Sequence, residues 1–176
     1  MEQRRIGGSD VWLSAIGLGA FELGYEEGEQ PDVDRARKVL QACLDESVGW
    51  LDTSENYLET RNESLVGTAL RDFPNEFAIS TKVAPSAGIT GGGSGFRPEQ
   101  IRPACLGSLR RLGVETIDVY LLHWPDDTGV PLADTWAAMA ALVDEDPGHL
   151  HGPKALRTII PDQPRPAEVV IAAAQG

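Results

Sequence analysis

The strongest constraint on this fold is an alternation of strand and helix patterns, repeated four times between residues 15 and 143. Short apolar runs predict strands at Ala15–Phe21, Trp50–Asp52, Phe77–Val83 and Thr116–His123. Helical spacing predicts helices from Asp32, the predicted N-cap, to before Gly49, and at Glu63–Leu70, Pro98–Leu112 and Leu132–Val143. Nearly continuous apolar strands separated by helices are typical of a parallel sheet covered by helices. The sequence therefore predicts the α/β class.

A small hairpin is predicted before the first of these units. Arg4–Ile6 and Val11–Leu13 flank the turn-forming run Gly7-Gly8-Ser9-Asp10. Two glycines follow in the first predicted strand, Gly17 and Gly19, and they indicate a close approach of the backbone to a neighbour. They do not complete a dinucleotide-binding fingerprint, because the third glycine of that motif is absent.

Three successive predicted strands finish on side chains capable of acid–base chemistry. These strand-end residues are Asp52, Lys82 and His123, and Tyr57 follows five positions after the first of them. The carboxyl ends of neighbouring parallel strands meet at one edge of a sheet. We therefore expect the four side chains to converge on one rim.

Composition disfavours several classes of partner. The chain has 176 residues and a net charge of −12, which disfavours nucleic acid and anionic membranes but still allows a small anionic ligand. Cys43 and Cys105 form no CxxC pair, so reduced thiols and a cytoplasmic setting are expected. No apolar run is long enough to span a bilayer. His149 and His151 match no closed zinc spacing, so no metal is predicted.

Several motifs together resemble those of a known family. They are Gly17-Leu18-Gly19, Leu51-Asp52-Thr53 with Asn56-Tyr57, Ile79-Ser80-Thr81-Lys82, and Ser108-Leu109 through Asp118 to Pro125. In order and spacing they resemble the aldo-keto reductases, (β/α)8 barrels that reduce carbonyls with NADPH. The resemblance covers residues 4 to about 145. It implies a catalytic set, called the rim tetrad here, consisting of Asp52, Tyr57, Lys82 and His123.

Elementary chemistry agrees with the roles that this resemblance implies. Reduction of a carbonyl requires a hydride donor and a proton donor. A tyrosine is a weak acid at neutral pH, and an ammonium group beside a phenol makes it a stronger one. Lys82 can supply that charge and Asp52 can hold Lys82 in position. His123 can form a hydrogen bond to the carbonyl oxygen and orient it.

The resemblance also implies contacts with the cofactor and the substrate. The candidate residues for NADPH binding are Gly19, Ala20, Asp52 and Arg165. Phe21 and Trp124 are candidates to line a substrate pocket, and core packing is the alternative for both.

The length of the chain differs from that of the family. A complete barrel of this type has roughly 250 residues, whereas four to five strand-helix units are recognisable here. The expected fold is thus an incomplete (β/α)8 TIM barrel over residues 1–145, with a divergent tail over residues 146–176. In the tail, Leu156–Ile160 and Pro166–Ala174 are either the last strand and helix of the family or unrelated sequence.

Two functional hypotheses of different class remain at this point. The first is an NADPH-dependent aldo-keto reductase acting on a small carbonyl substrate. The second is a shortened, non-catalytic remnant that acts as a binding or assembly module. An incomplete barrel leaves an open sheet edge, which favours pairing with another copy as a homo-oligomer.

Overall fold

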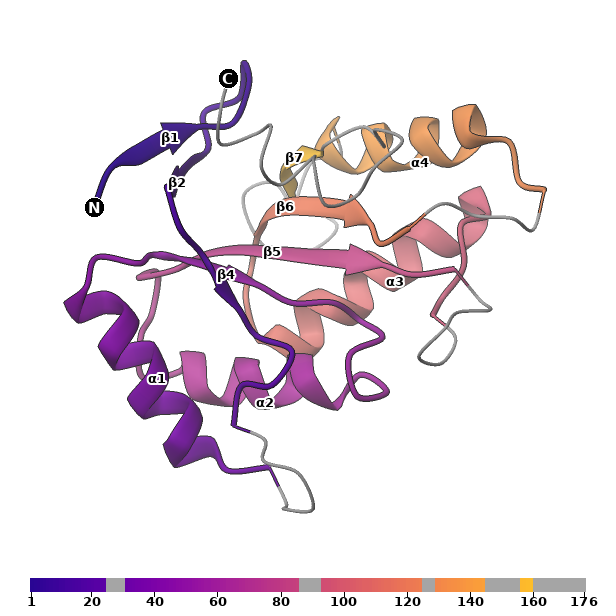
Figure 1. Cartoon of the computed structure of the whole chain (residues 1–176). Coiled ribbons are helices and arrows are strands. Elements are labelled where there is room, and N and C mark those ends of the chain that lie inside the picture. Colours follow the sequence, from indigo (N-terminus) through magenta and orange to yellow (C-terminus); the bar gives the residue numbers. More distant parts are fainter. Residues whose placement is uncertain (25–30, 86–92, 125–128, 145–155, 160–176) are drawn as a thin grey trace.

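Five parallel strands in chain order form the sheet around which the rest of the chain is built (Figure 1). The computed structural model describes residues 1–24, 31–85, 93–124, 129–144 and 156–159. The strands of the sheet are β3 (Leu18–Gly19), β4 (Trp50–Asp52), β5 (Ala78–Val83), β6 (Ile117–Leu122) and β7 (Leu156–Ile159). The helices are α1 (Val33–Asp45), α2 (Arg61–Leu70), α3 (Pro98–Leu112) and α4 (Leu132–Asp144). The α/β class and the parallel sheet are confirmed.

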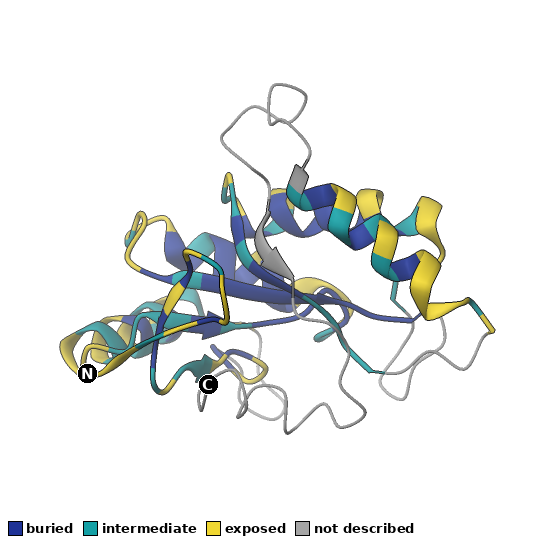
Figure 2. Ribbon diagram, turned by 90° about the horizontal axis from the view of Figure 1, so that it is seen from above, coloured by how far each residue is buried: buried dark blue, intermediate teal, exposed yellow. Residues whose placement is uncertain are grey.

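The two faces of the sheet have different neighbours, because successive residues of a strand point to opposite faces. On the outer face, Leu51 and Ile79 pack against α1 and α2, and Tyr120 packs against α3 and α4. On the inner face, Trp50 and Val119 contact the N-terminal hairpin. Figure 2 shows that the strands and the sheet-facing sides of the helices are the buried parts. Burial on both faces explains why the strands are almost continuously apolar.

The predicted N-terminal hairpin is present. Its strands, β1 (Gln3–Arg5) and β2 (Trp12–Ser14), pair antiparallel and lie one residue away from the predicted bounds. The Ser14 hydroxyl accepts a hydrogen bond of 3.1 Å from the backbone N–H of Gly49. This bond holds the hairpin against the start of β4.

The first parallel strand is shorter than the predicted Ala15–Phe21. Only Leu18–Gly19 pairs with β4. Before this strand, Gly17 lies so close to Trp50 that a Cβ would be 2.5 Å from the indole ring. The predicted close approach is therefore found at Gly17, whereas at Gly19 a Cβ would meet nothing within 4 Å.

The helices follow the predicted bounds closely. α3 begins and ends as predicted, and it continues through Pro103. α2 begins two residues earlier than predicted, at Arg61. Asp32 caps α1 by accepting hydrogen bonds from the backbone of Asp34 and Arg35, and these bonds lower the pKa of its carboxyl group. None of the described helices is both long and apolar enough to cross a membrane.

The sheet has two free edges among the described residues. β3 pairs only with β4 and β7 only with β6, so the described strands form an open sheet, an incomplete (β/α)8 barrel. In a closed barrel the last strand lies next to the first, but β7 occupies the place of a fifth strand. The predicted helix Pro166–Ala174 lies outside the described residues, and the division after residue 145 stays a prediction.

Candidate active site

The rim tetrad lies at the carboxyl ends of three neighbouring strands. Asp52 is the last residue of β4, Lys82 is close to the end of β5, and His123 directly follows β6. Parallel registry aligns Asp52 with Ser80 and Lys82 with Leu121. Tyr57 lies in the turn between β4 and α2. The predicted convergence of the four side chains on one rim is confirmed by the contacts described next.

Lys82 lies at the centre of the group. Its Nζ donates to Asp52 Oδ2 at 2.6 Å, to the Thr53 carbonyl at 2.7 Å and to the Tyr57 hydroxyl at 3.4 Å. The residue is only 9% exposed. A buried ammonium group requires a negative partner, and Asp52 provides it. The arrangement places a fixed positive charge beside a phenol.

A second hydrogen bond fixes the orientation of Asp52. Its Oδ1 accepts from the buried Ser80 hydroxyl at 2.6 Å, and that hydroxyl accepts from Trp50 Nε1 at 2.9 Å. Ser80 was not among the site residues predicted from the sequence. Its position two residues before Lys82 on the same strand, and hence on the same face, was the available signal.

His123 lies beside Tyr57 in a partly buried position. The two ring centroids are 5.3 Å apart and the rings are inclined at 72°. Burial, together with the positive charge of Lys82, lowers the pKa of His123 to about 3. The ring is therefore neutral at neutral pH. Its Nδ1 is 2.8 Å from the hydroxyl oxygen of Ser54, a residue that sequence analysis did not identify.

The two predicted substrate residues lie on either side of these rings. The Phe21 ring meets Tyr57 edge-on at a centroid distance of 5.0 Å, and Phe21 is 44% exposed. The Trp124 ring lies 4.1 Å from the His123 ring. Both aromatic side chains thus flank the rim tetrad. Their contact with a substrate stays a prediction.

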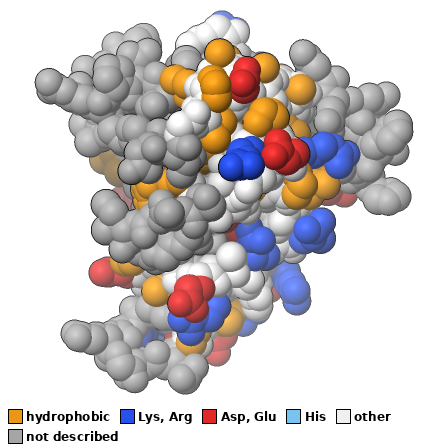
Figure 3. All heavy atoms as spheres, turned by 90° about the vertical axis from the view of Figure 1, so that its right-hand side faces the viewer, with side chains coloured by type: hydrophobic (Ala, Val, Ile, Leu, Met, Phe, Trp, Pro, Cys, Tyr) orange, Lys and Arg blue, Asp and Glu red, His pale blue; other side chains and the backbone are white. Residues whose placement is uncertain are grey.

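The candidate cofactor residues differ in what they offer to a ligand. Gly19 is exposed and has open space where a side chain would be. Ala20 is fully buried, its N–H donates to the Asp52 carbonyl and its C=O accepts from Asn62. Arg165 lies outside the described residues. Figure 3 looks from the side toward which β5 points, where the described surface carries both basic and acidic side chains. Gly19 and Asp52 are partners in the pairing of β3 with β4, so these two candidates lie side by side at the rim.

A buried carboxylate ties the Tyr57 turn to the segment that follows β5. Glu55 is 3% exposed and accepts hydrogen bonds from the Ala84 N–H at 2.9 Å, the Ser94 N–H at 2.8 Å and the Ser94 hydroxyl at 2.7 Å. Glu55 was not predicted from the sequence, because its partners are 29 and 39 positions away. The contact restricts the turn that carries Tyr57.

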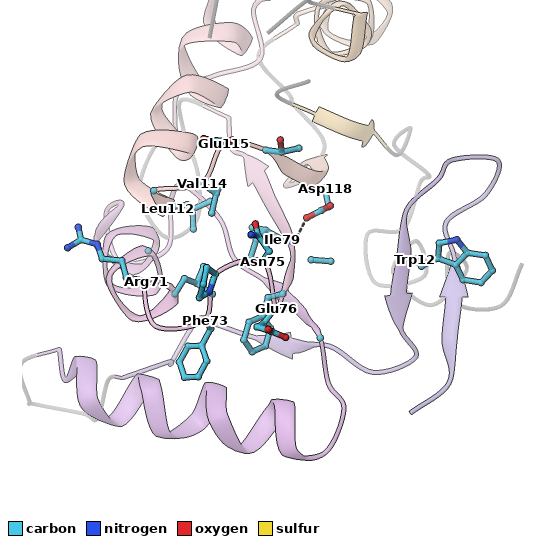
Figure 4. Close-up of a pocket in the computed structure, with 18 of the residues that line it drawn as sticks. Trp12, Arg71, Phe73, Asn75, Glu76, Ile79, Leu112, Val114, Glu115 and Asp118 are labelled. Carbon is cyan, nitrogen blue, oxygen red and sulfur yellow. Dashed lines mark hydrogen bonds between the residues drawn. The ribbon is translucent and has the colours of Figure 1, made fainter. Parts of the chain in front are cut away.

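A separate hollow lies at the opposite end of the strands. Figure 4 shows residues near the starts of β5 and β6 around it, among them Arg71, Glu76 and Asp118. Asp118 Oδ2 accepts a hydrogen bond of 2.8 Å from the Ile79 N–H there. No member of the rim tetrad lines this hollow. Among the residues that the structure describes, no cluster of three or more His, Cys, Asp or Glu side chains is placed to hold a metal ion.

Comparison with known proteins identifies the family. The family model described as "Aldo/keto reductase family" matches residues 15–146, which include the whole rim tetrad. This chain belongs to the aldo/keto reductase family. A relative from Oryza sativa subsp. japonica, named "Probable voltage-gated potassium channel subunit beta", is 33% identical over 82% of this chain and 43% of that protein.

Solved aldo-keto reductases share the fold. One from Bacillus halodurans, in its holo form, has a TM-score of 0.73 and 29% identity over 90% of this chain and 49% of that chain. Another, from Klebsiella pneumoniae in complex with NADPH, has a TM-score of 0.65 and 30% identity over 90% and 49% of the two chains. The chain thus spans about half the length of the relatives that it matches.

Proposed function

We propose that this oxidoreductase-family chain reduces an aldehyde or ketone to an alcohol, with NADPH as the hydride donor. The observation that carries the proposal is the position of Lys82 Nζ, which contacts both Asp52 Oδ2 and the Tyr57 hydroxyl. A positive charge beside a phenol promotes transfer of the phenolic proton to a substrate oxygen.

Each member of the rim tetrad has one role in this proposal. Tyr57 donates the proton, and Lys82 stabilises the phenolate that this leaves. Asp52 holds the ammonium group of Lys82 in place through the 2.6 Å contact. His123, neutral and beside Tyr57, orients the substrate oxygen by a hydrogen bond. Phe21 and Trp124 flank the site that the substrate occupies.

The cofactor assignment rests on the family and on the shape of the rim. When bound, NADPH supplies the hydride. The open space at Gly19 and the adjacent Asp52 form the proposed binding site for the nicotinamide end of the cofactor. A relative solved with NADPH supports this choice of cofactor. Arg165 is the proposed partner of a cofactor phosphate. We further propose a cytoplasmic protein, because neither Cys43 nor Cys105 forms a disulfide.

Loss of NADPH absorbance with an aromatic aldehyde tests this function. The parent chain should oxidise NADPH only when aldehyde is present. Tyr57→Phe removes the proton donor and keeps the ring, so the rate should fall 10²–10⁴-fold. Phe73→Leu, a ring substitution far from the rim, is the control and should retain activity. Equal rates for the parent and Tyr57→Phe would contradict the proposed mechanism.

A second candidate function is a non-catalytic assembly module. The observation that favours it is the open sheet, in which β3 and β7 are both edges. A relative is named as a channel subunit, which is an assembly role. We propose pairing with another copy through an edge, giving a homo-oligomer. A chain that forms oligomers yet oxidises no NADPH with any aldehyde would favour this candidate.

A further inference from the structure

Asn62 is a buried polar residue beside the rim that the proposed mechanism does not use. It is the second residue of α2 and is fully buried. Its side-chain nitrogen donates to the Ala20 carbonyl at 2.6 Å and to the Phe21 carbonyl at 3.1 Å. Its side-chain oxygen accepts from the Thr53 hydroxyl at 2.7 Å. A single amide group therefore joins α2 to the end of β4 and to the turn that follows β3.

The chemistry of these partners determines the orientation of the amide. Backbone carbonyls can only accept, so the group that faces both of them must be the NH2 group, and its two hydrogens match the two carbonyls. The amide oxygen then faces the Thr53 hydroxyl, which can donate. The two carbonyls belong to successive residues. The amide thus restrains both the position and the direction of the backbone that carries Phe21.

The backbone of Asn62 restrains Tyr57 as well. Its N–H donates to the Tyr57 carbonyl at 3.4 Å. Between the two residues, residues 58–60 all have positive φ, from 52° to 71°, which is costly for residues that carry a Cβ. Such a turn persists only where the surrounding contacts hold it. Asn62 is therefore bonded to the backbone of both Phe21 and Tyr57.

We propose that Asn62 is a positioning residue that holds the Phe21 ring against the Tyr57 ring. The two rings meet edge-on at a centroid distance of 5.0 Å, and Asn62 bonds to the backbone of each. The consequence for the reaction rests on the proposed function. With Tyr57 as the proton donor, the exposed Phe21 ring lies where an apolar substituent of the carbonyl packs. Asn62 should therefore favour aromatic over small aliphatic aldehydes.

NMR of the full chain tests the ring contact and requires neither cofactor nor activity. A neighbouring aromatic ring shifts the ¹H signals of the Tyr57 ring, so Phe21→Leu should change these signals. Tyr57→Phe identifies them among the signals of the three tyrosines. In an Asn62→Ala background the Phe21 ring is no longer held in place, so Phe21→Leu should change the signals much less. An equal change with and without the amide would overturn the proposal.

Thr53→Val is the matched control. It removes the hydroxyl that donates to the Asn62 oxygen, keeps a similar shape, and leaves both bonds to the turn after β3 in place. In this background Phe21→Leu should change the Tyr57 signals as much as in the parent. If Thr53→Val behaved like Asn62→Ala, loss of any buried hydrogen bond here would move the ring, and the specific role of the NH2 group would be refuted.

A measurement on the parent decides the question if Asn62→Ala does not fold. Both side-chain N–H hydrogens of Asn62 are bonded to carbonyls in a buried position, so they should exchange slowly with solvent. Fast exchange of these hydrogens would show that the amide does not hold the turn, and it would overturn the proposal. Backbone amide spectra verify the fold of every variant.

Steady-state kinetics tests the substrate preference, and this measurement alone depends on the proposed function. Asn62→Ala should raise KM for benzaldehyde about 2–10-fold, the factor that corresponds to one aromatic contact, and should raise KM for propanal less. Alanine retains the backbone N–H that bonds to Tyr57, so kcat should change little. Equal increases in KM for the two aldehydes would contradict the preference. An inactive parent would reject the proposed function, while the NMR comparison would still decide the role of Asn62.

Discussion

Lys82 illustrates how a single residue depends on its partners at the rim. Its ammonium group is almost completely buried, and it has one carboxylate, one carbonyl and one hydroxyl around it. Removing one member of such a pair leaves an uncompensated charge, which costs about 3–5 kcal/mol for a buried pair. Because Asp52 is itself a quarter exposed, water would offset part of that cost here. The same contacts that serve the proposed chemistry also stabilise the fold locally.

At the residue scale, His123 should make stability depend on pH. Its folded-state pKa of about 3 is below the value of 6.5 for a free histidine. Above pH 6.5, His123 is neutral in both the folded and the unfolded chain, so it does not lower the free energy of unfolding. As pH falls from 6.5 toward 3, the unfolded chain binds a proton that the folded chain does not, so the free energy of unfolding decreases.

Urea unfolding between pH 8 and 5 checks this prediction, with His123→Asn as the matched control. The parent should lose more stability than the variant over this range, because the carboxylates and the other two histidines are common to both chains. Parallel pH profiles for the two proteins would show that His123 is not held neutral by the fold.

At the element scale, the contact between α2 and α3 determines how two helices cover the sheet. Gly67 of α2 lies against the backbone of Arg111 and Leu112, and a Cβ there would be 2.3 Å from the Arg111 carbonyl oxygen. Beside this contact, the fully buried Glu63 accepts hydrogen bonds of 2.7 Å from Thr81 of β5 and from Arg111 of α3. Close approach of the helices and this polar contact therefore occur together.

Gly67→Ala should destabilise the chain despite the better helix propensity of alanine. The propensity gain is about 1 kcal/mol. Overpacking costs about 1–3 kcal/mol and occasionally more, and we expect the upper end here because the backbone atoms that a Cβ would meet cannot move aside as a flexible side chain can. Thermal unfolding measures the difference. Ser64→Ala, at an exposed position of the same helix, is the control and should change stability by about 0.5 kcal/mol or less. A Gly67→Ala variant at least as stable as the parent would show that the helices can separate without cost.

At the scale of the whole molecule, we expect the open sheet to limit what one copy can bind. Affinity for a dinucleotide comes from groups that converge on both of its ends. The chain covers about half of its relatives' length, and its described cofactor candidates are confined to the rim. Asp162 lies three positions before Arg165 in the sequence, and we expect its negative charge to weaken the attraction of the proposed Arg165 site for a phosphate. One exposed ion pair contributes only about 0–1 kcal/mol.

We therefore expect an isolated monomer of this chain to bind NADPH weakly or not at all. Fluorescence titration combined with analytical ultracentrifugation measures affinity and assembly in the same samples. Binding that appears only as copies associate would support a pocket completed across an edge of the sheet. Micromolar or tighter binding by a species that sediments as a monomer would contradict the expectation and favour the simple enzyme.

Local patterns in the sequence determined much of this molecule. The order of strands and helices, the bounds of α3 and the cap at Asp32 follow from short-range periodicity and end signals, which act within a few residues. The convergence of the rim tetrad was also predictable, because parallel strands bring their carboxyl ends to one edge. The length of β3 was not, since it depends on which residues pair with β4, and only Leu18 and Gly19 do so.

Only the tertiary structure decided the partners of the rim side chains. The contact of Ser54 with His123 spans 69 positions, and that of Ser80 with Asp52 spans 28. Contacts between residues so far apart leave no pattern in the local sequence. The register of the parallel strands determines which side chains lie beside one another. The place of β7 beside β6 was likewise settled by strand pairing, because an apolar run can pair with any edge that remains open.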